Sequence, residues 1–235
     1  MSTERKVAMI TGASQGIGAA LVKGYRDRGY RVIATARTME SSGDDEILVV
    51  AGDIADRRTA ERAVAEGIDR FGRIDTLVNN AGIFIGKPFT EYTEVDFAAM
   101  LGVNLAGFFH STQLAIAQME QRGGGHVVQI STSLVDHAVA GMPSVLASLT
   151  KGGLNAATRS LAIEYARRGI RVNAVALGVV RTPMNPVETR ELAMRHPLGR
   201  MGEIADVVDA VLYLESAGFV TGEILHVDGG QSAGH

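Results

Sequence analysis

The stretch TGASQGIG, residues 11–18, decides the fold of this chain of 235 residues. It follows the apolar run at residues 7–10 and leads directly into a helical pattern at residues 16–28. A glycine-rich turn between a strand and a helix is typical of dinucleotide sites, because free N–H groups and the positive end of the helix dipole face the phosphates. The order strand, turn, helix therefore predicts a nucleotide-binding α/β fold.

The three glycines of this turn have separable tasks. Gly12 permits a tight turn, Gly16 lets the backbone approach a pyrophosphate, and Gly18 allows close packing of helix on strand. A glycine triplet alone also fits an ordinary β-to-α turn, and the flanking strand and helix favour the dinucleotide interpretation. The residues of the turn that we expect to contact the cofactor are Gly12, Ser14, Gln15, Gly16, Ile17 and Gly18.

Short runs rich in Val, Ile and Ala alternate with longer helical patterns along the chain, which indicates βαβ units on a parallel sheet. We expect seven strands, mostly apolar and covered on both faces, at residues 7–10, 31–35, 47–51, 76–78, 126–131, 170–176 and 224–227. We expect helices at residues 16–28, 57–71, 94–121, 144–168 and 204–215. Residues 38–46 are too short and too rich in Ser, Gly and Asp for a crossover helix. The sequence predicts one doubly wound, Rossmann-type α/β domain over residues 1–235.

The composition argues against several classes of function. The net charge is −3 with scattered basic residues, so we expect no nucleic-acid partner. The absence of cysteine excludes disulfides and thiolate metal sites, and no His, Asp and Glu cluster has metal-ligand spacing, so we expect no metal. No apolar stretch reaches the roughly 18 residues of a membrane span. The charged start has no secretory leader pattern, and we expect a cytoplasmic protein without a membrane partner.

Further motifs follow the glycine-rich turn in a characteristic order. The turn has the spacing G-x-x-x-G-x-G, and the later motifs are Asp53-Ile54, Asn79-Asn80-Ala81-Gly82, Val103-Asn104, Asn173, Gly178, Thr182-Pro183, Thr221-Gly222-Glu223 and Val227-Asp228-Gly229-Gly230. On these motifs, residues 6–230 resemble the short-chain dehydrogenase/reductase family. Each motif also has a structural alternative: Asp53 as a turn former, Asn80 in an Asx-turn, and Asn104 as a satisfied buried amide.

The resemblance implies a nicotinamide cofactor and assigns its contacts. Asp53 and Ile54 correspond to the pair that contacts adenine. The motif with Asn80, Ala81 and Gly82 is the family's NNAG, and Gly178, Val180 and Thr182 lie in the stretch that closes on nicotinamide.

The end of the second strand indicates which nicotinamide cofactor is preferred. Ala36 stands where relatives that prefer NAD carry an acidic residue, and Arg37 follows at once, able to bind a 2′-phosphate. Ser14 can add a hydroxyl to that phosphate. The alternatives are that Arg37 is a solvated surface residue, and that Gln15, which lacks the charge of many NADP-specific relatives, weakens the preference. We expect NADP(H) as the preferred cofactor and keep NAD(H) as the alternative.

The catalytic residues of the family are Ser, Tyr and Lys, and this chain matches them incompletely. Lys151 is present, but the tyrosine position four residues earlier is Ala147, and no tyrosine lies between Tyr92 and Tyr165. Thr132 stands at the family's serine, with Ser133 as the second choice. Asn104 and Lys151 complete the expected catalytic set, and Lys151 also hydrogen-bonds the nicotinamide ribose in this family.

A carbonyl reduced by hydride needs a proton donor for its oxygen. Four candidates replace the missing phenol: Lys151, a water in the space of the phenol, Ser148 and His137, although an exposed loop histidine is the simpler interpretation of His137. Two functions therefore remain open. One is an NADP(H)-dependent oxidoreductase for a small carbonyl or alcohol substrate; the other is a non-catalytic NADP(H)-binding protein with a sensing or assembly role.

Two further expectations concern the surface. Residues 184–202, where the family's substrate lid lies, carry Arg190, Arg195 and His196, which we interpret as solvated charges rather than ligands. The helices predicted at residues 94–121 and 144–168 are apolar on more than one face. We therefore expect a homo-oligomer, and the resemblance implies a dimer or tetramer built on these two helices.

Overall fold

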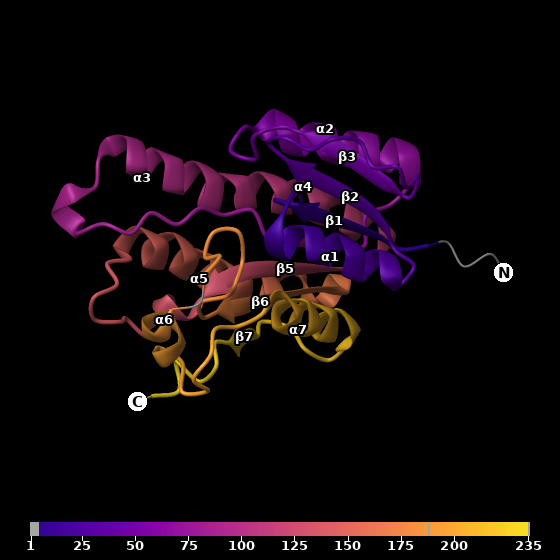
Figure 1. The fold of residues 1–235 in the computed structure, drawn as a ribbon. Helices are drawn as coiled ribbons and strands as arrows, with labels where there is room; N and C mark the ends of the chain where they lie inside the picture. The colour runs from indigo at the N-terminus through magenta and orange to yellow at the C-terminus, as the bar shows by residue number, and fades with distance from the viewer. Residues whose placement is uncertain (1–4, 188, 235) are drawn as a thin grey trace.

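Seven parallel strands form one sheet at the centre of the molecule (Figure 1), in the order β3-β2-β1-β4-β5-β6-β7. The computed structural model describes residues 5–187 and 189–234; Met1 to Glu4 of the charged start and Glu188 of the predicted lid lie outside them. Adjacent strands pair in parallel throughout. The strands are β1 Val7–Thr11, β2 Arg31–Ala36, β3 Ile47–Ala51, β4 Thr76–Asn79, β5 Gly125–Thr132, β6 Ile170–Leu177 and β7 Ile224–Val227.

Helices cover both faces of this sheet. The long helices are α1 Gly16–Asp27, α2 Arg57–Phe71, α4 Gly107–Arg122, α5 Val145–Tyr165 and α7 Ile204–Ser216, and the short ones are α3 Glu94–Leu101 and α6 Arg190–Met194. One hydrophobic core joins the sheet to α1 and α7, through residues such as Leu21 and Val211. A second core joins the opposite face to α2, α4 and α5, through Val64, Ile116 and Ala162.

The predicted fold class and the seven strands are confirmed, and the strand boundaries agree to within one residue. The segment between β2 and β3 contains no helix, as expected. The single helix predicted at residues 94–121 is instead α3, a π-helical segment Gly102–Ala106 and α4. Asn104 lies in the π segment and both accepts from the Ile83 N–H, at 2.9 Å, and donates to the Ile83 carbonyl, at 3.1 Å. Short π-helical segments inside α-helices are frequent at functional sites.

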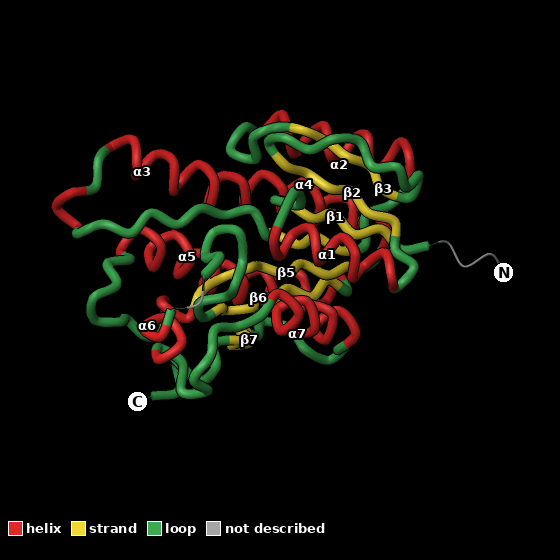
Figure 2. Tube along the Cα trace, in the orientation of Figure 1, coloured by secondary structure: helices red, strands yellow, loops and turns green. Residues whose placement is uncertain are grey.

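The helix α6 was not predicted, because five residues are too few to show a helical periodicity. It lies within the predicted lid, beyond the end of the sheet from which the loops after β4, β5 and β6 extend (Figure 2). The strand order reverses between β1 and β4, and ligands of doubly wound sheets bind at the carboxyl ends of the strands at such a point. Among the described residues, no helix has both the length and the apolar content of a membrane span.

A buried polar cluster anchors α7 at the amino ends of the strands. The carboxylate of Glu215 accepts hydrogen bonds from His126 at 2.9 Å, Tyr30 at 3.0 Å, Thr76 at 3.0 Å and Tyr25 at 3.2 Å. Burial lowers the pKa of His126 and keeps its ring neutral. A neutral ring that donates from Nδ1 to Glu215 can accept at Nε2 from Asn173, which lies 3.2 Å away.

The same cluster determines the charge of Glu215. Burial alone raises the pKa of this carboxyl, but the hydrogen bonds from His126, Thr76 and Tyr30 hold it below its ordinary value. The charged carboxylate therefore stabilises the fold at neutral pH. Because the folded pKa is depressed, this contribution is present above the unfolded pKa and is lost as the pH falls below it.

Replacing Glu215 by Gln should lower the free energy of unfolding by about 2–3 kcal/mol, since an amide leaves buried donors without an acceptor. For a chain of this size, that loss lowers Tm by about 4–12 °C at pH 7. The difference from wild type should shrink as the pH falls below about 4.5, the ordinary pKa of the carboxyl. Differential scanning calorimetry measures both effects, with Asp209→Asn on the exposed side of α7 as the control. Equal Tm values for Glu215→Gln and Asp209→Asn would refute the anchoring role.

Candidate active site

A cavity of about 730 Å³ runs along the carboxyl ends of the strands. Its walls come from segments that follow each of the seven strands and from α5. All but one of the site residues expected from the sequence line it: Gly12, Ser14, Gln15, Gly16, Ile17, Gly18, Arg37, Asp53, Ile54, Asn80, Ala81, Gly82, Thr132, Ser133, Lys151, Gly178, Val180 and Thr182. The exception is Asn104, which lies behind the wall. The structure thus brings residues from the whole chain to one place.

The geometry of the glycine-rich turn requires glycine at positions 12, 16 and 18, through the backbone angles at two of them and steric overlap at two. Gly12 and Gly16 have φ angles of +67° and +56°, which other residues rarely adopt. A Cβ at Gly12 would lie 2.9 Å from the Ala81 Cα, and one at Gly18 would overlap the Gly12 carbonyl oxygen. The backbone N–H groups at the start of α1 are therefore open to the cavity, and this arrangement fits the pyrophosphate of a dinucleotide.

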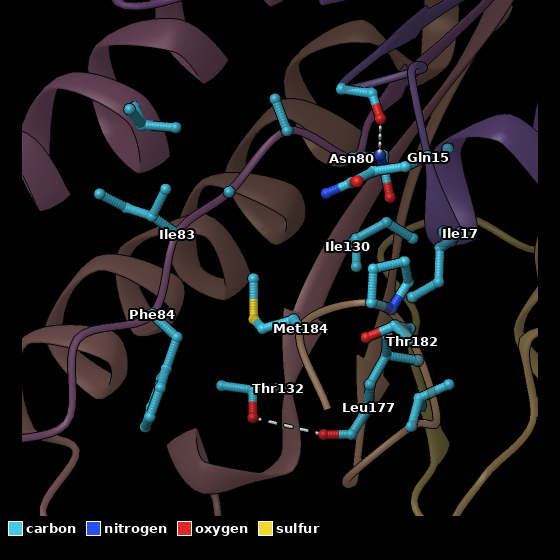
Figure 3. Close-up of a pocket in the computed structure, with 18 of the residues that line it drawn as sticks. Gln15, Ile17, Asn80, Ile83, Phe84, Ile130, Thr132, Leu177, Thr182 and Met184 are labelled. Atoms are coloured by element: carbon cyan, nitrogen blue, oxygen red, sulfur yellow. Dashed lines mark hydrogen bonds between the residues drawn. The ribbon is translucent and has the colours of Figure 1, made fainter. Parts of the chain in front are cut away.

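Asn80, next to the glycine-rich turn in Figure 3, holds that turn in place. Its Nδ2 donates to the carbonyls of Thr11 and Gly12, at 2.9 and 3.0 Å. In return, the Thr11 hydroxyl accepts from the backbone N–H groups of Asn80 and Ala81, at 3.1 and 3.0 Å. These four bonds join the ends of β1 and β4 across the point where the strand order reverses.

The ends of β2 and β3 form the rim of the cavity. Ala36 is buried, whereas Arg37 is exposed and makes no hydrogen bond or ion pair within the described part of the chain. The Asp53 carboxylate accepts from the Ala55 N–H at 2.9 Å, which is the turn-forming role considered for it, and it still faces the cavity. Ile54 is buried against Gly107 of α4. The guanidinium of Arg37 and the apolar side chain of Ile54 thus lie at the rim of the cavity.

Lys151 and Asn104 meet beside Gly82. A Cβ on Gly82 would lie 3.2 Å from Lys151 Nζ and 3.4 Å from Asn104 Oδ1. Lys151 Nζ donates to the Ile130 carbonyl at 2.6 Å, and burial lowers the pKa of this lysine to about 8. Asn104 is buried and donates to the Thr150 hydroxyl at 3.2 Å. Asn104 therefore positions its neighbours from behind, while Lys151 faces the cavity.

The two hydroxyls considered for the serine role differ in accessibility. Thr132 and Ser133 both donate to the Leu177 carbonyl, at 3.3 and 3.2 Å. Ser133 is fully buried, whereas Thr132 is only partly buried and its bond to Leu177 crosses the cavity wall in Figure 3. Thr132 is therefore the more accessible of the two hydroxyls.

Ala147 lies on the cavity wall one helical turn before Lys151, and only 3% of it is exposed. It packs with Met100 and Leu146 in a small apolar cluster. None of the described residues that line the cavity is a tyrosine or a histidine. Of the candidate proton donors, Ser148 donates its hydroxyl to the Leu134 carbonyl at 3.1 Å and, like His137, lies outside the lining. Of the three side chains considered as proton donors, Lys151 is the one that lines the cavity.

The interpretation of the lid charges as solvated was wrong for His196 and for Arg195, whose side chain is only 14% exposed. His196 is 2% exposed, and its Nε2 accepts from the Val179 N–H at 3.0 Å, so the ring is packed beneath the loop after β6. A Cβ on Gly178 would lie 2.7 Å from the same nitrogen. Arg190 is exposed, as expected, and Arg195 pairs with Glu191 at 2.7 Å. Within residues 5–187 and 189–234, no group of His, Asp and Glu could hold a metal ion.

Sequence reasoning missed the apolar part of the cavity. Six side chains on the loops after β4, β5 and β6 and on α6 contribute to it: Ile83, Phe84, Leu134, Met142, Met184 and Leu192. Isolated apolar residues in loops show no periodicity, so no pattern marks them as site residues.

Comparisons with known proteins agree with this geometry. A family model described as enoyl-(acyl carrier protein) reductase matches residues 12–232. A 3-oxoacyl-[acyl-carrier-protein] reductase of Thermotoga maritima is 36% identical over 246 residues, covering 98% of this chain and 99% of the relative. The structure of ElxO with NADP bound has a TM-score of 0.91 at 28% identity, covering 98% of this chain and 100% of the other.

A 3-ketoacyl-(acyl-carrier-protein) reductase from Brucella melitensis, complexed with NADH, also superposes with a TM-score of 0.91. It is 30% identical and covers 98% of this chain and 100% of its own. The family match extends over nearly all of the sequence that carries the glycine-rich turn and the later motifs. This chain belongs to the short-chain dehydrogenase/reductase family.

Proposed function

We propose that this chain is an NADP(H)-dependent oxidoreductase that interconverts a small carbonyl compound and its alcohol. The observation that carries this proposal is the single cavity that contains the glycine-rich turn, the exposed Arg37 and the ammonium of Lys151. These groups suit, in turn, the pyrophosphate of the cofactor, its 2′-phosphate and the carbonyl of the substrate.

The preference for NADP(H) rests on two neighbouring residues. Arg37 has a guanidinium with no partner in the described chain, and such a fork binds phosphate with charge-assisted hydrogen bonds. Ala36 offers no carboxylate to hold a ribose 2′-hydroxyl, and the exposed Ser14 can donate to the same phosphate. Related structures contain NADP or NADH, so the choice depends on these residues of the chain itself.

The bound cofactor supplies or accepts the hydride, and the chain's own residues manage the proton. Lys151 uses one N–H for the Ile130 carbonyl and keeps two for the oxygen of a substrate carbonyl, directly or through a water. With its pKa near 8, Lys151 is mostly an ammonium at neutral pH and can donate a proton. Thr132 is the accessible hydroxyl beside it.

Ala147 favours a second candidate function. In this family a tyrosine at its position supplies the proton, and here that position is an alanine packed among apolar residues. Losing a general acid typically lowers the rate by about 10²- to 10⁴-fold. The second candidate is therefore a non-catalytic or weakly active NADP(H)-binding protein with a sensing or assembly role.

The proposal includes assembly with a second copy of this chain, as a dimer or tetramer. Phe109 on α4 and Leu149 and Ile163 on α5 are large apolar side chains that remain exposed. Two-fold pairing of these helices would bury the same patch on both copies.

Replacing Arg37 by Ala should weaken NADPH binding by about 10- to 100-fold, because a charge-assisted contact to phosphate contributes about 1.5–3 kcal/mol. NADH carries no 2′-phosphate, so its affinity should change by less than about twofold. Fluorescence titration measures both affinities, with Arg28→Ala, an exposed arginine at the end of α1 opposite the glycine-rich turn, as control. Equal losses for NADPH and NADH would show that Arg37 does not bind the phosphate.

Replacing Ala147 by Tyr should raise NADPH-dependent carbonyl reduction by about 10²-fold or more, because it places a phenol one turn from Lys151. Ala147→Phe is the matched control, since it adds the ring without the hydroxyl. Either ring can cost about 1–3 kcal/mol by overpacking, so Tm and NADPH affinity are measured in both variants. If both variants fold, bind NADPH and remain as inert as wild type, the non-catalytic function is favoured.

In size-exclusion chromatography with light scattering at micromolar concentration, we expect a dimer or tetramer. Ile163→Asp should reduce the mass to that of the monomer, because it places a charge in the apolar patch on α5. The control is Val187→Asp, which changes an exposed apolar residue outside both helices. A monomeric wild type would contradict the proposed assembly.

A further inference from the structure

The cavity has two chemically different halves. One half lies over β3, β2 and β1, where the glycine-rich turn and Arg37 are found. The other half lies over β5, β6 and β7 and extends to α6. Its side chains come from separate segments of the chain and are apolar: Ile83, Phe84, Leu134, Met142, Met184 and Leu192. In Figure 3, Phe84, Met184 and Thr132 surround this second half.

The charged groups of the cavity are distributed unequally. Of the described residues that line it, only Arg37, Asp53 and Lys151 carry a charge. Arg37 follows β2 and Asp53 follows β3, so both belong to the first half. The second half thus has a single charged group, Lys151, and that ammonium already donates to the Ile130 carbonyl. A carboxylate or phosphate on the body of a substrate would lose its hydration there, because Lys151 is engaged by the Ile130 carbonyl and the substrate's carbonyl oxygen and no second cation lines this half.

Three hydroxyls of the second half bond to the chain itself. Ser131 donates to the Asn155 side chain at 2.7 Å, and Thr132 and Ser133 donate to the Leu177 carbonyl. Gln231, whose buried Oε1 has no hydrogen-bond partner among the described residues, and Asn185 add two side-chain amides to the lining. Two amides are too few for a substrate with a hydroxyl on every carbon, which would leave several hydrogen bonds unmade.

We propose that this half of the cavity selects, through Phe84, Met142, Met184 and Leu192 among its apolar side chains, an uncharged carbonyl compound with an apolar body, such as an alkyl or aryl ketone or aldehyde. The proposal rests on the oxidoreductase function above and names its substrate class. The apolar body contacts the four side chains, and the carbonyl oxygen points to Lys151 and Thr132. Sugars, carboxylates and phosphate esters should bind more weakly, because most of their polar groups would find no partner there.

Equilibrium binding tests this inference independently of turnover. The protein is first saturated with NADP⁺, and isothermal titration calorimetry then compares an apolar set with two contrasting compounds. The apolar set is acetophenone, cyclohexanone and benzaldehyde. The contrasting compounds are p-carboxyacetophenone, which adds one carboxylate to the same body, and D-glucose. We expect at least one apolar compound to bind, and p-carboxyacetophenone to bind at least about tenfold more weakly than acetophenone.

A pair of matched variants locates the binding site. Met184 is 61% exposed and lines the cavity, whereas Met194 on α6 is 67% exposed and does not line it. Met184→Lys should weaken acetophenone and strengthen p-carboxyacetophenone by about tenfold, since it adds a cation to the apolar half. Met194→Lys adds the same charge outside the cavity and should change neither affinity. Because both methionines are exposed, both variants should fold, and NADP⁺ affinity confirms it.

Three results would overturn the inference. The first is binding of D-glucose or p-carboxyacetophenone to wild type as tight as that of the apolar compounds. The second is NADP⁺ binding with no binding of any apolar carbonyl compound, which refutes the substrate class and leaves the cofactor site intact. The third is an equal response of the Met184 and Met194 variants. Failure to bind either NADP⁺ or NADPH would instead refute the proposed function, and this substrate class with it.

Discussion

The hydrogen bonds from the Asn80 amide to the carbonyls of Thr11 and Gly12 are the constraint on which the rest of the site depends. They join β1 and β4, the strands between which the order of the sheet reverses. The contact is so close that Gly12 and Gly18 have no room for a Cβ. This junction sets the position of the first helix and the exposed N–H groups of its turn. The backbone of two adjacent strands therefore positions the glycine-rich turn, and the other lining residues surround it.

A second set of hydrogen bonds positions the residues around Lys151. Asn104 fixes the loop after β4 through Ile83, and Lys151 is held by the Ile130 carbonyl. This scaffold would orient a carbonyl beside an ammonium with or without a phenol. Ala147 packs with Met100 and Leu146 and leaves these contacts undisturbed. In the proposed function, in which Ala147 stands in place of the family's tyrosine, Lys151 donates the proton, and its pKa near 8 suits it to this role.

The sequence predicted most of the fold and most of the residues that line the half of the cavity with the glycine-rich turn, because both depend on local patterns. The strands are apolar runs, and the turn at residues 11–18 carries its function in three glycines. The π segment around Asn104 was not predictable from a local pattern, since Asn104 bonds there to Ile83 on another loop. The burial of His196 was missed for the same reason: its partner, the Val179 N–H, lies on a different segment. The apolar half depends on loop residues such as Phe84 and Met184, which meet only in three dimensions.

The pH dependence of hydride transfer shows whether Lys151 donates the proton. The rate of NADPH oxidation in a single turnover, at saturating cofactor and with an apolar ketone, is measured by stopped-flow for wild type and Lys151→Met. We predict a wild-type rate that is constant below pH about 8 and falls above it, as the Lys151 ammonium loses its proton. We expect Lys151→Met to be slower by about 10²-fold or more and to lack this pH step. A wild-type rate that is unchanged through pH 8, or a Lys151→Met variant that keeps both the rate and the step while binding NADPH normally, would contradict proton donation by Lys151.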